Sequence, residues 1–62
     1  MKRSHLIKHI RQYNCSLLRE GSNHSWYQND ATGSFASVPR HNEIKDILAN
    51  AICKQLEIPR IK

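Results

Sequence analysis

The sequence is poor in residues that break, bend or cross-link a chain. Its 62 residues include only two glycines, two prolines and two cysteines. Cys15 and Cys53 form no CxxC pair, which excludes the common zinc and redox motifs. No apolar run approaches the roughly 20 residues of a membrane-spanning helix or the apolar core of a signal peptide. We therefore expect a cytoplasmic protein, without membrane association, whose two cysteines are free thiols.

Acidic residues are also scarce, and this imbalance is the first indication of a partner. The sequence contains ten Lys and Arg residues but only five Asp and Glu, which gives a net charge of +5. Four histidines add titratable positions. A surplus of positive charge favours an anionic partner such as nucleic acid, an acidic protein or a membrane surface. A charge of this size is also within the range that serves solubility alone. The length allows one small domain, residues 1–62.

The first half of the chain predicts a helix followed by strands. Leu6, Ile7, Ile10 and Tyr13 recur at helical spacing, so we expect a helix over 4–13 that Ser4 caps and Asn14 ends. Strands are predicted over 15–20, 23–28 and 34–38, with a polar hairpin loop over 29–33. Alternation in the middle strand places His24, Trp26 and Gln28 on one face and Ser25 and Tyr27 on the other.

A second helix is predicted after Pro39, with Asn42 as its cap and Glu43 in its first turn. Its apolar stripe comprises Ile44, Ile47, Leu48, Ala51, Ile52 and Leu56, and Pro59 prevents continuation. Cys53 lies outside this stripe, so we expect it to be exposed. The order helix, three-stranded antiparallel meander, helix predicts a two-layer α+β sandwich with both helices on one face of the sheet.

Two histidines provide the clearest candidates for chemistry. Metal-free cleavage of an RNA phosphodiester needs a general base, a general acid and cations for the developing charge, and histidine can serve either proton role. His24 opens the middle strand, and His41 follows the last strand. If these strands pair, His24 lies near residues 38–40 and near the N-terminus of the second helix, a potential phosphate site. The candidate phosphate contacts are Lys2, Arg3, Arg40 and Lys45.

Other chemistries have weaker support in the sequence. His5 and His9 share one face of the first helix but have no acidic residue between them, so a metal site is disfavoured. Neither cysteine is predicted at a helix N-terminus, where a thiolate would be stabilised. Trp26, Tyr27 and Phe35 could stack on bases from the open sheet face, although parity makes one of Trp26 and Tyr27 a core residue.

Several segments together resemble the HicA family of toxins. They are Gly21-Ser22-Asn23-His24, Trp26-Tyr27, Val38-Pro39-Arg40-His41, Glu43-Ile44 and the ending Ala51 to Leu56. The resemblance covers essentially the whole chain. It implies the double-stranded-RNA-binding-domain-like fold, α-β-β-β-α. It also implies an endoribonuclease, an mRNA interferase that halts translation without a cofactor, and a HicB antitoxin protein that covers the active site.

The resemblance assigns the catalytic role to His24, with Asn23 and His41 as neighbouring RNA contacts; direct DNA binding is not expected. Many members carry their histidine directly after Gly-Ser, where this chain has Asn23, and a one-residue change along a strand reverses its face. Many members also have a Gly-Thr pair early in the second helix and a glycine near the C-terminus, where Asp46-Ile47 and Glu57 stand here. Two alternatives to the nuclease are a non-catalytic RNA-binding module and a basic surface that docks an acidic protein.

Overall fold

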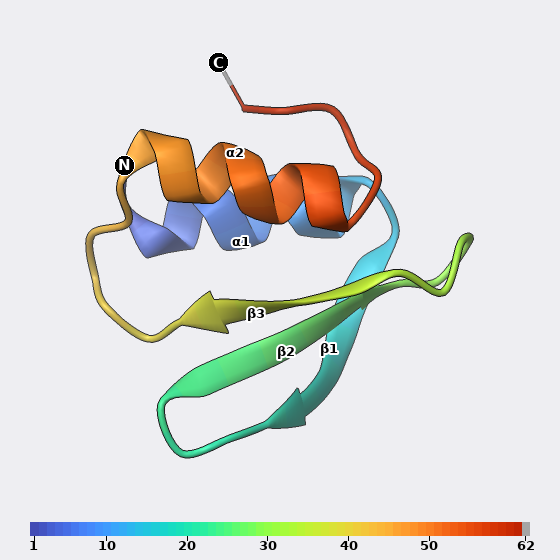
Figure 1. The fold of residues 1–62 in the computed structure, drawn as a ribbon, viewed down its shortest axis with the longest axis horizontal. Coiled ribbons are helices and arrows are strands. Elements are labelled where there is room, and N and C mark those ends of the chain that lie inside the picture. The colour runs from blue at the N-terminus through green and yellow to red at the C-terminus, as the bar shows by residue number, and fades with distance from the viewer. Residues whose placement is uncertain (62) are drawn as a thin grey trace.

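The structure, a computed structural model, describes residues 1–61 and shows two helices and three strands in the predicted order (Figure 1). They are α1 (Arg3–Gln12), β1 (Cys15–Glu20), β2 (His24–Asn29), β3 (Phe35–Pro39) and α2 (Asp46–Gln55). The bounds of β1 agree with the prediction, and β2 and β3 each lie one residue later than predicted. No helix in the described part of the chain is long and apolar enough to cross a membrane.

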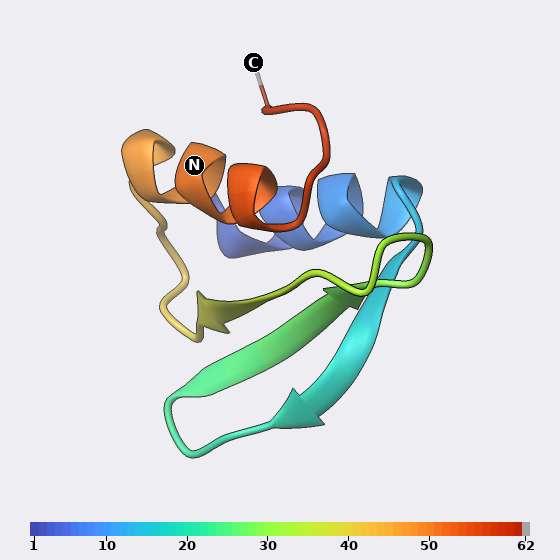
Figure 2. The same ribbon diagram turned by 45° about the vertical axis from the view of Figure 1, so that its right-hand side comes forward.

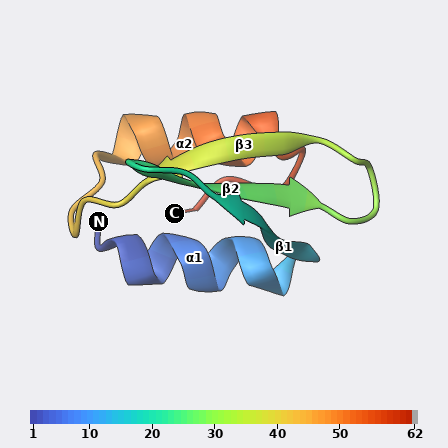
Figure 3. The same cartoon turned by 90° about the horizontal axis from the view of Figure 1, so that it is seen from below.

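The strands form one antiparallel sheet in the order β1-β2-β3. Both helices pack on the same face of this sheet, α1 beside β1 and α2 beside β3 (Figures 2 and 3). The predicted two-layer α+β sandwich is therefore confirmed. The layout is the α-β-β-β-α arrangement of double-stranded-RNA-binding domains, with the second face of the sheet left open.

The core lies between the helices and the covered face of the sheet. Its buried residues are Leu6, Ile10, Cys15, Tyr27, Ala36, Val38, Ile44, Ala49, Ile52, Cys53 and Leu56. Ser25 and Tyr27 are buried, whereas His24 is exposed and Trp26 is partly exposed. The predicted division of β2 into two faces is therefore confirmed. Both cysteines are free, as expected.

The start of α1 differs from the prediction. Ser4 is not the cap: the helix begins at Arg3, and Lys2, in an extended conformation, is the N-cap without a side-chain hydrogen bond. The Arg3 N–H instead donates to Asn42 O at 2.8 Å, and Lys2 forms an isolated antiparallel bridge with Glu43. The backbone at the start of α1 is thus hydrogen-bonded to a segment that is distant in the sequence. At the other end Asn14 adopts a φ of 65°, which confirms its predicted place in the turn.

The start of α2 was also predicted wrongly. Asn42 is not its cap, because Asn42 to Ile44 pair with the N-terminal segment and the helix begins only at Asp46. The buried face is consequently Ala49, Ile52, Cys53 and Leu56, a spacing of three, four and seven residues. Ile47 is 87% exposed, and Leu48 and Ala51 are exposed too. Cys53 is fully buried, contrary to expectation, because this shift of face turns it inward.

A β-bulge in β1 sets the direction of the last side chains of that strand. Leu17 pairs with Tyr27, but the next pair joins Arg19 to Trp26, so Leu18 is an extra residue. An extra residue in one strand reverses the faces of all that follow it. Arg19 therefore shares the open face with Trp26, and Glu20 shares the covered face with Ser25. We did not predict this bulge from the sequence.

The end of α2 is attached to the β2–β3 loop. The Asn29 side chain, which is buried, donates from Nδ2 to Leu56 O at 2.8 Å and accepts at Oδ1 from the Ala31 N–H at 2.9 Å. One amide thus satisfies a carbonyl at the helix end and orders the loop. Gly33 has a φ of 82° in this loop, a conformation that glycine adopts without strain.

Candidate RNA-contacting site around His24

His24 is the exposed first residue of β2 and pairs with Pro39 at the end of β3. Its carbonyl oxygen accepts a hydrogen bond of 2.8 Å from the Gly21 N–H, which closes the turn between β1 and β2. The turn is tight at Gly21, where an added Cβ would lie 3.3 Å from His24 O. A larger residue at position 21 would therefore require the backbone at His24 to shift by a few tenths of an ångström.

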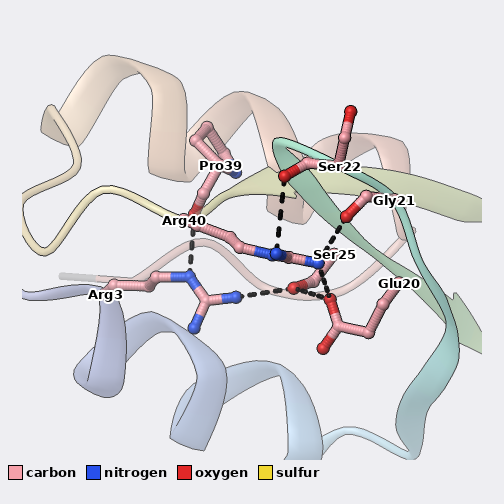
Figure 4. A network of polar contacts seen from close by, with 7 residues as sticks. All are labelled: Arg3, Glu20, Gly21, Ser22, Ser25, Pro39 and Arg40. Atoms are coloured by element: carbon pink, nitrogen blue, oxygen red, sulfur yellow. Dashed lines mark hydrogen bonds and ion pairs between the residues drawn. The ribbon is translucent and has the colours of Figure 1, made fainter.

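The Arg40 side chain extends from the end of β3 to this turn (Figure 4). Its guanidinium donates to Glu20 Oε1 at 2.8 Å and to the carbonyl oxygens of Gly21 and Ser22. Arg40 directly follows β3, whereas its acceptors belong to β1 and the turn. The contacts therefore fix the position of the His24 turn relative to both outer strands.

Arg3, the first residue of α1, also forms hydrogen bonds with this region. Arg3 donates from Nε to Pro39 O at 2.7 Å and from Nη2 to Ser25 Oγ at 2.8 Å, and Ser25 Oγ donates to Glu20 Oε1 at 2.7 Å (Figure 4). Glu20 is thus the common acceptor for Ser25 and Arg40. These hydrogen bonds, from Ser25 first and then Arg40, lower the pKa of the Glu20 carboxyl, so it is ionised at neutral pH.

The remaining predicted contacts lie in the β1–β2 turn, in the segment after β3 and at the starts of the two helices. Asn23 is exposed in the turn, and His41 is exposed after Arg40. Lys2 lines a hollow of about 410 Å³ together with Arg3, Ser4, Asn42 and Glu43. The exposed Lys45 is the N-cap of α2. Because α2 begins at Asp46, its N-terminus does not directly follow His41 as the sequence suggested.

The predicted cations thus fall into two groups. Arg3 and Arg40 already donate to protein acceptors, so their first role in this structure is to hold the His24 turn. Lys2 and Lys45 are exposed. We missed Glu20 and Ser25 as members of this network. The distance along the sequence between Arg3, Glu20 and Arg40 leaves no local pattern that could have indicated their contact.

The open face of the sheet carries further groups beside His24. Trp26 follows His24 on this face, and its ring centroid lies 6.1 Å from that of Phe35 on β3. The Arg19 guanidinium lies 6.0 Å from the Trp26 ring centroid. Arg19 was absent from our predicted site, because the bulge that turns it to this face is not visible in the sequence.

Groups suited to metal binding do not gather in the described residues. Residues 1–61 contain no cluster of three or more His, Cys, Asp or Glu side chains. His9, one of the two histidines considered for a metal, forms a hydrogen bond of 2.6 Å between Nε2 and Pro59 O. This contact joins α1 to the segment after α2, which gives His9 a structural role.

Comparison with known proteins supports the resemblance seen in the sequence. A family model described as the HicA toxin of bacterial toxin-antitoxin systems matches residues 3–58 of the 62-residue chain. No match was found among curated proteins or among solved structures. The match extends from the first residue of α1 to beyond α2, and so includes the complete sheet and the His24 turn. The chain belongs to the HicA family of bacterial toxins.

Proposed function

We propose that this toxin is an endoribonuclease, an mRNA interferase that cleaves mRNA with His24 as general acid/base and without a metal ion. The observation that carries the proposal is the placement of His24: its imidazole is exposed, while hydrogen bonds from Gly21 and Arg40 hold the turn that bears it. A side chain that must exchange protons needs access to the substrate, and its geometry must be maintained.

The proposed reaction needs a general base, a general acid and donors for the phosphates, and residues around His24 can supply them. A base removes the proton of the ribose 2′-hydroxyl, the oxygen attacks the adjacent phosphorus, and an acid protonates the leaving 5′-oxygen. His24 takes one of these proton transfers. His41 is the candidate for the other, because it lies two residues beyond Pro39, the cross-strand partner of His24. Lys2, Lys45 and the Asn23 amide supply donors for the phosphates.

The proposal includes neutralisation by a HicB antitoxin protein that covers His24. Support comes from the family and from the charge of +5, which suits an acidic partner. Because His24 is exposed, it is accessible to a phosphodiester and also to a protein that covers the turn. Cleavage should therefore stop when the antitoxin binds, and RNA and antitoxin should compete.

The experiment compares His24→Ala with His5→Ala, a matched control on the exposed face of α1. Cleavage of mRNA should fall by about 10²- to 10⁴-fold in the first variant and remain unchanged in the second. Both should retain the native circular dichroism spectrum and antitoxin binding, and a chelator should not inhibit. Full cleavage by folded His24→Ala would refute the role of His24. RNA binding without cleavage by the wild type would favour a non-catalytic RNA-binding module.

A further inference from the structure

Two aromatic rings lie on the face of the sheet opposite the one that the helices cover. Phe35 is 57% exposed and Trp26 is partly exposed, and their centroids are 6.1 Å apart with an interplanar angle of 59°. Figure 3 shows the sheet from the side opposite the helices. Exposing a phenyl ring costs hydrophobic stabilisation that burial would provide, so packing does not explain this pair.

Arg19 completes the group. Its guanidinium carbon lies 6.0 Å from the Trp26 ring centroid, a distance at which a cation is attracted to the face of an indole. The β1 bulge is what brings Arg19 to this face. We call Arg19, Trp26 and Phe35 the stacking surface. It combines planar groups with a positive charge, as proteins that bind single-stranded nucleic acid do.

A hollow adjoins the stacking surface at β3. It encloses about 440 Å³ and is lined by Trp26, Ser34, Phe35, Ala36, Ser37 and Gln55. Two aromatic rings thus stand beside hydroxyl and amide groups. The rings can contact the faces of a planar ligand, while the polar groups can reach hydrogen-bonding atoms at its edges.

The stacking surface is next to His24 on the same face. His24 and Trp26 are two positions apart along one strand, a distance of about 7 Å. A nucleotide held at Trp26 therefore places a neighbouring phosphodiester within reach of His24. His24 and Trp26 thus follow one another along β2, with Arg19 on β1 and Phe35 on β3 beside Trp26.

We propose that the stacking surface binds an unpaired base of single-stranded RNA and positions the adjacent phosphodiester at His24; this inference rests on the proposed function. Bases in a duplex are already stacked and offer no free faces, so the bound RNA is single-stranded here. An acidic polypeptide fits less well, because carboxylates are repelled by the negative faces of aromatic rings. The net charge of +5 attracts the RNA backbone.

The sole tryptophan of the chain makes the proposal directly measurable. The probe is a 2′-O-methyl oligoribonucleotide of about eight nucleotides, which lacks the attacking hydroxyl and is not cleaved. Trp26 fluorescence should be quenched on binding. An abasic oligonucleotide with the same backbone should bind roughly 5- to 100-fold more weakly, without quenching. Equal binding and equal quenching by the two probes would overturn the proposal.

Substitutions separate stacking from charge. Phe35→Ala should weaken binding of the base-bearing probe by roughly 5-fold or more and leave the abasic probe unaffected. Ile47→Ala, which removes an even more exposed side chain on α2, is the matched control and should bind both probes as the wild type does. Arg19→Lys should weaken base binding less than Arg19→Ala. Unchanged binding by folded Phe35→Ala would contradict the proposal.

Failure of this inference can be told apart from failure of the proposed nuclease. Cleavage that requires His24 but is unaffected by Phe35→Ala would leave the nuclease in place and remove the stacking surface. Base-dependent quenching in a protein that never cleaves RNA would do the reverse. Polyglutamate tests the other class of ligand, and quenching by polyglutamate but not by the oligonucleotide would identify the surface as a protein-docking site.

Discussion

Arg40 Nη2 lies 2.8 Å from Glu20 Oε1, and this ion pair connects the residue after β3 to the last residue of β1. The two residues flank β2, so their contact spans the strand that begins at His24. Because Arg40 also donates to the Gly21 and Ser22 carbonyls, the pair belongs to the support of the turn.

Arg40 should act as a positioning residue. Lysine retains the positive charge but cannot donate to three separate acceptors in a planar fan. We expect Arg40→Lys to cleave RNA more slowly by on the order of ten- to hundredfold, with an unchanged salt dependence of binding. Arg11→Lys, on the exposed side of α1, is the control. If Arg40→Lys cleaved at the wild-type rate, Arg40 would serve through its charge alone.

Glu20 should contribute to the acid sensitivity of the fold. Its pKa is lowered in the folded state, chiefly by the hydrogen bond from Ser25 and then by that from Arg40. The ionised carboxylate therefore stabilises the protein fully above its unfolded pKa, which is about 4.3. This contribution declines as the pH falls from there through the folded pKa. Urea unfolding of wild type and Glu20→Gln between pH 7 and 3 should show a small difference that disappears in acid. A difference independent of pH would contradict this assignment.

Glu57 occupies a position that suits glycine. It follows the C-cap of α2 with a φ of 59°, in the left-handed region where a Cβ costs roughly 1–2 kcal/mol. Glu57→Gly should raise the free energy of unfolding by about 1 kcal/mol, or the melting temperature by about 4–8 °C. Both this variant and Glu57→Ala lose the hydrogen bond that Ser34 Oγ donates to the Glu57 carboxylate. Glu57→Ala also retains the backbone strain, so it should not stabilise. Stabilisation by both variants would point to charge rather than backbone strain.

The two thiols should be unreactive in the folded protein. Burial raises the pKa of both Cys15 and Cys53, so each is a protonated thiol at neutral pH. An aromatic disulfide reagent at pH 7.5 should react slowly with the native protein and rapidly with both thiols in denaturant. Cys53→Ala identifies the contribution of Cys15 alone. Rapid reaction of either thiol under native conditions would show that its burial is transient.

Comparison of particular residues shows why part of this structure could be predicted. The alternation of His24, Ser25, Trp26 and Tyr27 assigned the faces of β2 correctly, because a strand has a period of two and one buried face. The start of α2 could not be predicted in this way. Asn42-Glu43 has the composition of a helix cap, but its backbone pairs with the N-terminal segment, a tertiary contact without a local signal.

The residues of the candidate site likewise include some that the sequence predicted and some that it did not. His24 and Arg40 were both predicted, because the segments that contain them resemble motifs of the family and because the expected pairing of the middle and last strands brings these segments together. Glu20, Ser25 and Arg19 were missed, since their roles depend on the bulge and on contacts between distant parts of the chain. Periodicity describes regular elements, and it fails where a single extra residue interrupts one.

Leu18, the extra residue of that bulge, has a consequence for evolution by insertion and deletion. The bulge accommodates Leu18 and still leaves Arg19 facing the Trp26 ring and Glu20 facing Ser25. A chain without Leu18 would pair Leu17, Arg19 and Glu20 with Tyr27, Trp26 and Ser25 in regular alternation, so loss of this residue would keep both side chains on the same faces. The bulge therefore lets β1 gain or lose one residue at this position without moving Arg19 or Glu20 to the other face of the sheet.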